Sequence, residues 1–157
     1  MKANPKIIDI LNARLSEELT AINQYIVHAE MCGNWRYERL QDAIRKRAIM
    51  EMKHAEKIIE RILFLEGAPT VSKLNQISIG LEVPMMLQLD HAAEILAIQN
   101  YNASIFQARQ LGDNATAALF ECILADEESH IDWIEAQQNQ IAQVGVQIYL
   151  EEQIKES

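Results

Sequence analysis

The chain contains very few residues at which a helix must stop. Its 157 residues include only 5 Gly and 3 Pro, and neither type occurs between Pro5 and Gly33, between Gly33 and Gly67, between Pro84 and Gly112, or between Gly112 and Gly145. Gly costs backbone entropy and Pro removes a hydrogen-bond donor, so both interrupt helices. Four long uninterrupted stretches therefore predict a mostly helical chain and exclude disordered, collagen-like and linker-like ones.

Apolar residues recur with helical spacing in each of these stretches. The four apolar stripes are Ile8, Leu11, Leu15, Ile22, Tyr25 and Ala29; Leu40, Ile44, Ile58, Ile62 and Leu65; Val83, Leu87, Ile98, Tyr101, Ile105 and Ala108; and Leu119, Ile123, Ile134 and Ile141. Gly112 is expected to end the third helix, and Asp113 or Asn114 to cap the fourth. A short fifth helix is expected within residues 146–154.

Residues 67–82 lack a helical period and form the longest predicted connection. Sixteen extended residues span about 50 Å, which matches helices of about 42 to 48 Å. The connection can therefore run back along the bundle and make the second and third helices parallel. The sequence predicts an all-α four-helix bundle with one long crossover, formed by residues 1–157 as a single domain.

The charge balance and the cysteines narrow the classes of function. With 14 basic and 23 acidic residues the net charge is −9, which disfavours binding to nucleic acids or anionic membranes. No apolar run approaches the roughly 20 residues that span a bilayer, and the first residues lead directly into an amphipathic pattern, so we expect a cytoplasmic protein. Cys32 and Cys122 are far apart and are expected to be ordinary buried thiols.

Acidic residues and histidines interrupt the apolar stripe of every long helix. They are Glu18 in the first, Glu51 and His54 in the second, Glu94 in the third, and Glu127 and His130 in the fourth. The two Glu-x-x-His pairs have the i, i+3 spacing that puts both side chains on one helix face. Glu18, Glu51 and His54 recur as Glu94, Glu127 and His130, and each is displaced by 76 residues. The same displacement relates Tyr25 to Tyr101. Two half-bundles related in this way would place equivalent ligand sets opposite each other.

Four carboxylates in one low-dielectric cavity cannot all remain ionised without compensating positive charge. Two divalent cations would supply that charge, and a carboxylate/imidazole set without thiolates suits iron or manganese. This is the ligand set known in di-metal carboxylate bundles. Two other interpretations remain: the acidic residues lie on a solvated face, or the bundle is purely structural and its polar core is protonated.

Residues 17–25, 51–56, 59–67 and 126–133 carry a resemblance that extends along nearly the whole chain. On these segments the sequence resembles bacterioferritin. The resemblance implies a 24-subunit shell, built from twofold dimers, that stores iron as a ferric mineral. It also implies a ferroxidase, an oxidoreductase that oxidises Fe²⁺ with O₂ or H₂O₂ at a diiron centre. By this analogy the six residues Glu18, Glu51, His54, Glu94, Glu127 and His130 hold two iron ions, which Glu51 and Glu127 bridge.

Met52 directly follows a predicted iron ligand and is expected to point out of the bundle. The resemblance implies that Met52 from each of two subunits ligates one haem b; packing at an ordinary interface is the alternative. It further implies a ferredoxin-type reductant for iron release and leaves open co-assembly with a second bacterioferritin subunit. Neither a nucleic acid nor a membrane is an expected partner.

Several positions depart from the pattern of some bacterioferritins. Lys46 and Met50 replace a His and an Asp of an inner-surface iron site, and Ile58 replaces the Tyr of an electron route that also uses Tyr25 and Trp133. Four polar residues match positions that line subunit pores in relatives, or else belong to an exposed polar patch: Asn34, Glu66, Asp132 and Asn139.

His28 and His91 have no Glu three residues before them, so we expect them to be surface or interfacial histidines. A competing function is a diiron or dimanganese redox enzyme that acts on peroxide or an organic substrate as a small oligomer.

Overall fold

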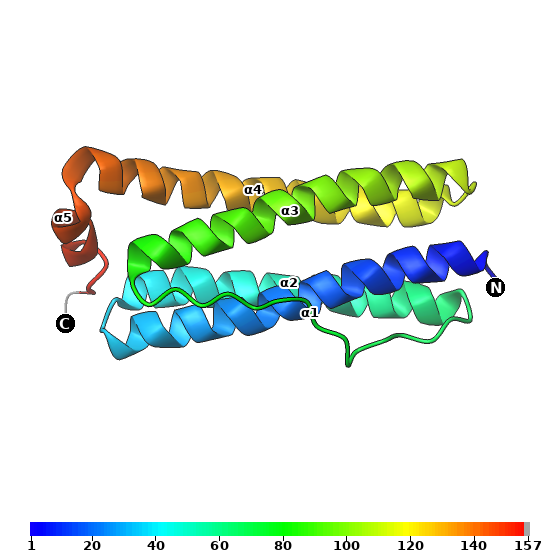
Figure 1. The fold of residues 1–157 in the computed structure, drawn as a ribbon, viewed down its shortest axis with the longest axis horizontal. Helices are drawn as coiled ribbons and strands as arrows, with labels where there is room; N and C mark the ends of the chain where they lie inside the picture. The colour runs from blue at the N-terminus through cyan, green and yellow to red at the C-terminus, as the bar shows by residue number, and fades with distance from the viewer. Residues whose placement is uncertain (156–157) are drawn as a thin grey trace.

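Four long helices and a short fifth form the protein in the computed structural model, which describes residues 1–155. They are α1 (Pro5–Asn34), α2 (Glu38–Phe64), α3 (Val83–Gln110), α4 (Asn114–Val144) and α5 (Val146–Glu151) (Figure 1). The predicted all-α class is confirmed, as is the short fifth helix, although that helix ends at Glu151.

The helix ends follow local chemistry. Asp113 caps α4 by accepting a hydrogen bond from the Thr116 backbone N–H at 3.0 Å. Gly112, after the end of α3, has φ +77°, a left-handed conformation that favours glycine. α2 begins three residues later than the periodicity suggested, because residues 35–37 form the turn between α1 and α2.

The crossover sets the topology of the bundle. α1 packs mainly against α2 and α3 mainly against α4, and both pairs are antiparallel. Residues 65–82 run back along the bundle between α2 and α3, so these two helices point the same way, as predicted (Figure 1).

Polar side chains of α1 hold the crossover in place. Backbone N–H groups at positions 70, 75, 78 and 80 donate hydrogen bonds to Asn12, Thr20, Gln24 and His28, respectively. These side chains replace the backbone partners that a segment without regular secondary structure lacks. The contacts explain how a long connection without its own secondary structure takes one path over the bundle.

The apolar core is divided into two clusters. One includes Leu11, Leu15, Ile58, Ile62 and Phe120, and the other includes Tyr25, Leu40, Ile44, Leu87 and Ile134. Along each long helix the acidic residues and histidines singled out above fall between these two clusters. The fold therefore surrounds one polar layer with apolar packing on both sides.

Three sequence-based expectations need correction. In α3, Ala97 rather than Ile98 enters the core, a shift of one residue in helical phase. Cys122 is exposed on α4, although Cys32 is buried as expected. His28 is fully buried, not at the surface, because Asp90 and the Gly80 N–H pair with both of its ring nitrogens. His91 is partly exposed and pairs with Glu135, in agreement with its predicted surface position.

Within residues 1–155, none of the helices combines the length and the apolar character that crossing a bilayer would require.

Candidate metal centre

All six predicted ligands lie in the polar layer at the middle of the bundle. Their exposed fractions are 2% for Glu18, 2% for Glu51, 5% for His54, 1% for Glu94, 1% for Glu127 and 4% for His130. Each long helix contributes at least one of them, since each residue lies on the core-facing stripe of its own helix. The residues are therefore inside the bundle and not on a solvated face.

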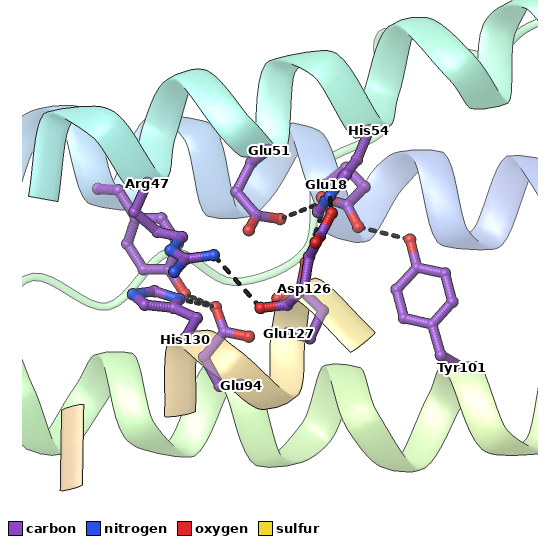
Figure 2. Close-up of polar contacts among 10 residues, drawn as sticks. Glu18, Arg47, Glu51, His54, Glu94, Tyr101, Asp126, Glu127 and His130 are labelled. Carbon is purple, nitrogen blue, oxygen red and sulfur yellow. Dashed lines mark hydrogen bonds and ion pairs between the residues drawn. The ribbon is translucent and has the colours of Figure 1, made fainter. Parts of the chain in front are cut away.

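The six side chains form two overlapping groups (Figure 2). One group is Glu18, Glu51, His54 and Glu127, and the other is Glu51, Glu94, Glu127 and His130. Within each group the potential ligand atoms lie within 4.8 Å of one another. Glu51 and Glu127 belong to both groups, the arrangement that two cations sharing a pair of carboxylates require.

Several buried polar atoms in this layer have no hydrogen-bond partner within residues 1–155. They are Oε2 of Glu18, Oε1 of Glu51, Nδ1 of His54, Oε2 of Glu94 and Oε1 of Glu127. Leaving such an atom unsatisfied costs about 1–3 kcal/mol, so a cluster of them requires an explanation. Two divalent cations would satisfy these oxygen and nitrogen atoms, and the mixture of carboxylate and imidazole fits iron or manganese.

The carboxylates differ in their affinity for protons. Burial, and then the nearby Glu18 carboxylate, raise the pKa of Glu51 well above its usual range. Burial, and then Glu94, likewise raise the pKa of Glu127. Burial acts on Glu94 too, but hydrogen bonds with Glu127 and His130 outweigh it and lower its pKa to about 2. Without a cation, protons on Glu51 and Glu127 therefore limit the negative charge of the layer.

The two histidines face the carboxylates in different ways. Nδ1 of His54 lies 3.1 Å from Oε1 of Glu127 and 3.5 Å from Oε2 of Glu18, without hydrogen-bond geometry. Burial lowers the pKa of His54, but the surrounding carboxylates outweigh that effect and raise it. Nδ1 of His130 lies 2.7 Å from Oε1 of Glu94. Burial lowers the pKa of His130, and the Glu94 carboxylate only partly offsets it.

Two buried tyrosines hold the outer carboxylates. The hydroxyl of Tyr101 donates to Glu18, and the hydroxyl of Tyr25 donates to Glu94. Burial, and then the negative charge of the accepting carboxylate, raise the pKa of both phenols, so both stay protonated as donors. The sequence did not predict this role, although the shared displacement of 76 residues was its signal.

Asp126 on α4 is a further polar residue that the sequence analysis did not single out. Its Oδ2 lies 2.8 Å from Nε2 of His54, on the side of the ring that faces away from the carboxylates. Asp126 lies one turn before His130 in the sequence, and this position gave no indication that its side chain would reach His54.

A cavity of about 220 Å³ opens onto the ligands from the side of α1, α3 and the crossover. Its lining includes Glu18, Glu51, Glu94 and Glu127, together with Glu17 and Gln24. The cavity thus gives the buried carboxylates a route toward the surface.

The remaining predicted residues lie around this centre. Met52 is 45% exposed, so it points out of the bundle as expected, while Ile58 is fully buried. The Trp133 ring stacks on His130 at 6.3 Å between centroids, and Tyr25 packs edge-on against His130 at 5.3 Å.

Other positions singled out by the resemblance are at the surface. Lys46 is exposed, and Met50 is partly buried. The four pore candidates are all exposed, a result compatible with a pore lining and with a polar patch alike: Asn34, Glu66, Asp132 and Asn139.

Comparison with known proteins agrees with this architecture. Residues 8–144 match the family model of the ferritin-like domain. The chain is 39% identical to a bacterioferritin of Mycolicibacterium paratuberculosis over 149 residues, covering 95% of this chain and 94% of that protein. It is 40% identical to one of Brucella melitensis over 149 residues (95% and 92%), and 38% identical to one of Streptomyces coelicolor over 157 residues (100% and 94%). The chain belongs to the bacterioferritin family of ferritin-like proteins.

Proposed function

We propose that this protein stores iron and oxidises it, as a ferroxidase that converts Fe²⁺ to Fe³⁺ at the six-residue centre. Family membership supports iron storage and a general oxidoreductase role. The observation that carries the finer proposal is the convergence of two ligand groups whose buried atoms lack partners and which share Glu51 and Glu127.

In this proposal two Fe²⁺ ions are the substrate and occupy neighbouring positions. Each ion loses one electron, and the pair reduces dioxygen to hydrogen peroxide or hydrogen peroxide to water. Delivering two electrons together avoids the release of a radical from the oxidant. The Fe³⁺ products are harder and more acidic cations, so they hydrolyse and mineralise inside the assembly.

The protein's own residues bind and orient the substrate. Glu51 and Glu127 release their protons as the cations enter, since both carboxylates are then neutralised by metal charge. Glu18 and Glu94 are already held in place by the hydroxyls of Tyr101 and Tyr25. The apolar clusters on both sides of the layer exclude bulk water and keep the geometry rigid.

Met52 would hold a haem at a contact between two subunits. Met52 is 45% exposed, and Ile49, one turn away on α2, is 42% exposed, which gives an apolar outer face around the Met52 sulfur. On this surface Met52 from each partner of a twofold dimer would hold the haem. When bound there, haem would supply one-electron transfer between the outside and the stored iron.

The family supports a multimeric assembly, and we propose a shell of 24 subunits. Such a shell would hold the ferric mineral, and a ferredoxin-type reductant would release the iron. Co-assembly with a second bacterioferritin subunit is compatible with this arrangement.

Stopped-flow oxidation of Fe²⁺ tests the centre directly. Glu127→Ala removes a shared ligand and should abolish the fast phase, whereas Glu128→Gln, which changes an exposed neighbour, should leave it intact. An unchanged fast phase in Glu127→Ala would remove the assignment. Light scattering tests storage separately: 24 chains of 17.9 kDa give about 430 kDa. A dimer would instead favour a diiron or dimanganese redox enzyme.

A further inference from the structure

The two halves of the centre have related ligands but different surroundings behind their imidazoles. Each histidine turns one ring nitrogen toward the carboxylates, which leaves the other nitrogen facing outward. For His54 the outward atom is Nε2, which lies 2.8 Å from Oδ2 of Asp126 on α4 (Figure 2). A carboxylate therefore fixes the tautomer and orientation of His54 and makes its inward nitrogen more basic.

His130 lacks this support. The displacement of 76 residues relates Asp126 to position 50, which is methionine. Met50 and His130 line one surface pocket of about 410 Å³, so position 50 faces the same space as His130. A thioether has no charge and is only a weak acceptor. Within residues 1–155, the one carboxylate paired with His130 is Glu94, and that contact is to the inward Nδ1.

The charges around His130 also differ from those around His54. Lys46 and Arg47 line the same pocket as His130, and Nη1 of Arg47 donates to the Asp126 carbonyl at 3.4 Å. Figure 2 shows Arg47 extending from α2 toward the His130 side of the centre. A cation next to His130 is thus repelled by the Arg47 guanidinium, whereas a cation next to His54 is attracted by Asp126.

We propose that the centre binds its two cations unequally: the position built on Glu18 and His54 fills first, and the position built on Glu94 and His130 fills second. Asp126 acts as a positioning residue through His54, and Met50 is the reason that His130 lacks an equivalent. The inference rests on the proposed metal centre and adds an order of binding and release to it. The second ion, next to the pocket, is the more readily lost.

Anaerobic titration of the full-length assembly with Co²⁺, followed by its visible absorption, tests this order without any oxidation chemistry. We expect two resolved binding steps per subunit. His130→Ala should remove the weaker step and His54→Ala the tighter one.

Two substitutions with matched controls test whether Asp126 and Met50 cause the difference in affinity. Asp126→Asn keeps the shape of the side chain and should weaken the tighter step by about 10- to 100-fold, the usual effect of losing such a partner. Glu128→Gln removes the same charge from an exposed position of α4 and should change neither step. Met50→Asp should strengthen the weaker step by a similar factor and bring the two constants together. Met50→Leu changes the same position without adding a charge and should leave the weaker step unchanged.

Each failure has a separate meaning. Equal affinities in the unmodified protein, loss of the tighter step in His130→Ala, or no effect of Asp126→Asn would overturn the proposed order. Met50→Asp would overturn it as well if it merely added a third ion or left the weaker step unchanged. If the unmodified protein shows no Co²⁺ binding that depends on Glu127, as tested with Glu127→Ala, the metal centre itself is contradicted.

Discussion

The hydroxyl of Tyr101 on α3 donates a hydrogen bond to Oε1 of Glu18 on α1 at 2.5 Å. The reciprocal contact is present as well, because Tyr25 on α1 donates to Glu94 on α3. Each of these two helices therefore carries one carboxylate of the proposed metal centre and one tyrosine that holds the carboxylate of the other helix. Pairing α1 with α3 in this way sets the outer carboxylates in place before any cation binds.

Tyr101→Phe should destabilise the metal-free protein. The substitution leaves Oε1 of Glu18 buried without its donor, which costs about 1–3 kcal/mol in the free energy of unfolding. Urea denaturation of metal-free protein measures this loss. Tyr37→Phe is the matched control, since no hydrogen bond from the Tyr37 hydroxyl is found within residues 1–155. Equal stability of the Tyr101→Phe variant and the unmodified protein would show that the contact contributes nothing.

The stability of the metal-free protein should fall as the pH rises from about 5 to about 8. The folded-state pKa values of Glu51 and Glu127 are raised above the ordinary value of 4.5, and that of His54 is raised above 6.5. Groups with raised pKa values contribute most below their unfolded pKa and lose that contribution as the pH increases through the folded one. Thermal denaturation across this range checks the direction.

Cation binding should reverse this pH dependence of stability, because the cations displace protons from the centre. Calorimetric titration with Co²⁺ in buffers of different ionisation enthalpy measures the number released. Glu51→Gln should release about one proton fewer than the unmodified protein, because its amide carries no proton to displace. Identical proton counts for the two proteins would mean that Glu51 is already ionised before the cation arrives.

His28→Leu should loosen the crossover. The ring accepts a hydrogen bond from the Gly80 N–H at 2.9 Å, and its other nitrogen lies 2.9 Å from Asp90, so the ring proton belongs on Nδ1. Leucine would leave the Gly80 N–H without its acceptor, at about 1–3 kcal/mol, while Oδ1 of Asp90 would lose one of two donors and keep its hydrogen bond from Gln24. Hydrogen exchange should show faster exchange at Gly80. His91→Leu, at a partly exposed histidine, provides the comparison, and equal protection of Gly80 in both variants would contradict this role.

Met52→Leu should abolish haem binding while leaving the six metal ligands in place. Leucine preserves the apolar face that includes Ile49 but removes the sulfur ligand. Visible spectra of protein purified with excess haem supplied would report the loss, and Fe²⁺ oxidation should be unchanged. An unaltered haem spectrum would leave Met52 as an ordinary interface residue.

Helical periodicity predicted a large part of the site, because a core-facing stripe is a local property of each helix. Glu18 and Glu94 could be placed on such stripes from spacing alone, and the two Glu-x-x-His pairs came with them. The same reasoning misplaced Ile98 by one residue, since neighbouring positions on a helix differ by only about 100° and packing decides between them. It also misjudged His28, whose burial depends on a crossover and on Asp90, both distant in sequence.

The amino-acid sequence by itself determined the four long helices, the crossover, the six-residue candidate site and its internal repeat, because breakers and apolar spacing act over short distances along the chain. Only the tertiary structure decided which side chains support those ligands. Tyr101 reaches Glu18 across 83 residues, and Asp126 reaches His54 across 72. Such contacts depend on the rotation and offset of one packed helix against another, which no local pattern specifies. The same packing gives the two repeated halves different surroundings: Asp126 lies behind the imidazole of His54, whereas His130 shares a pocket with Met50.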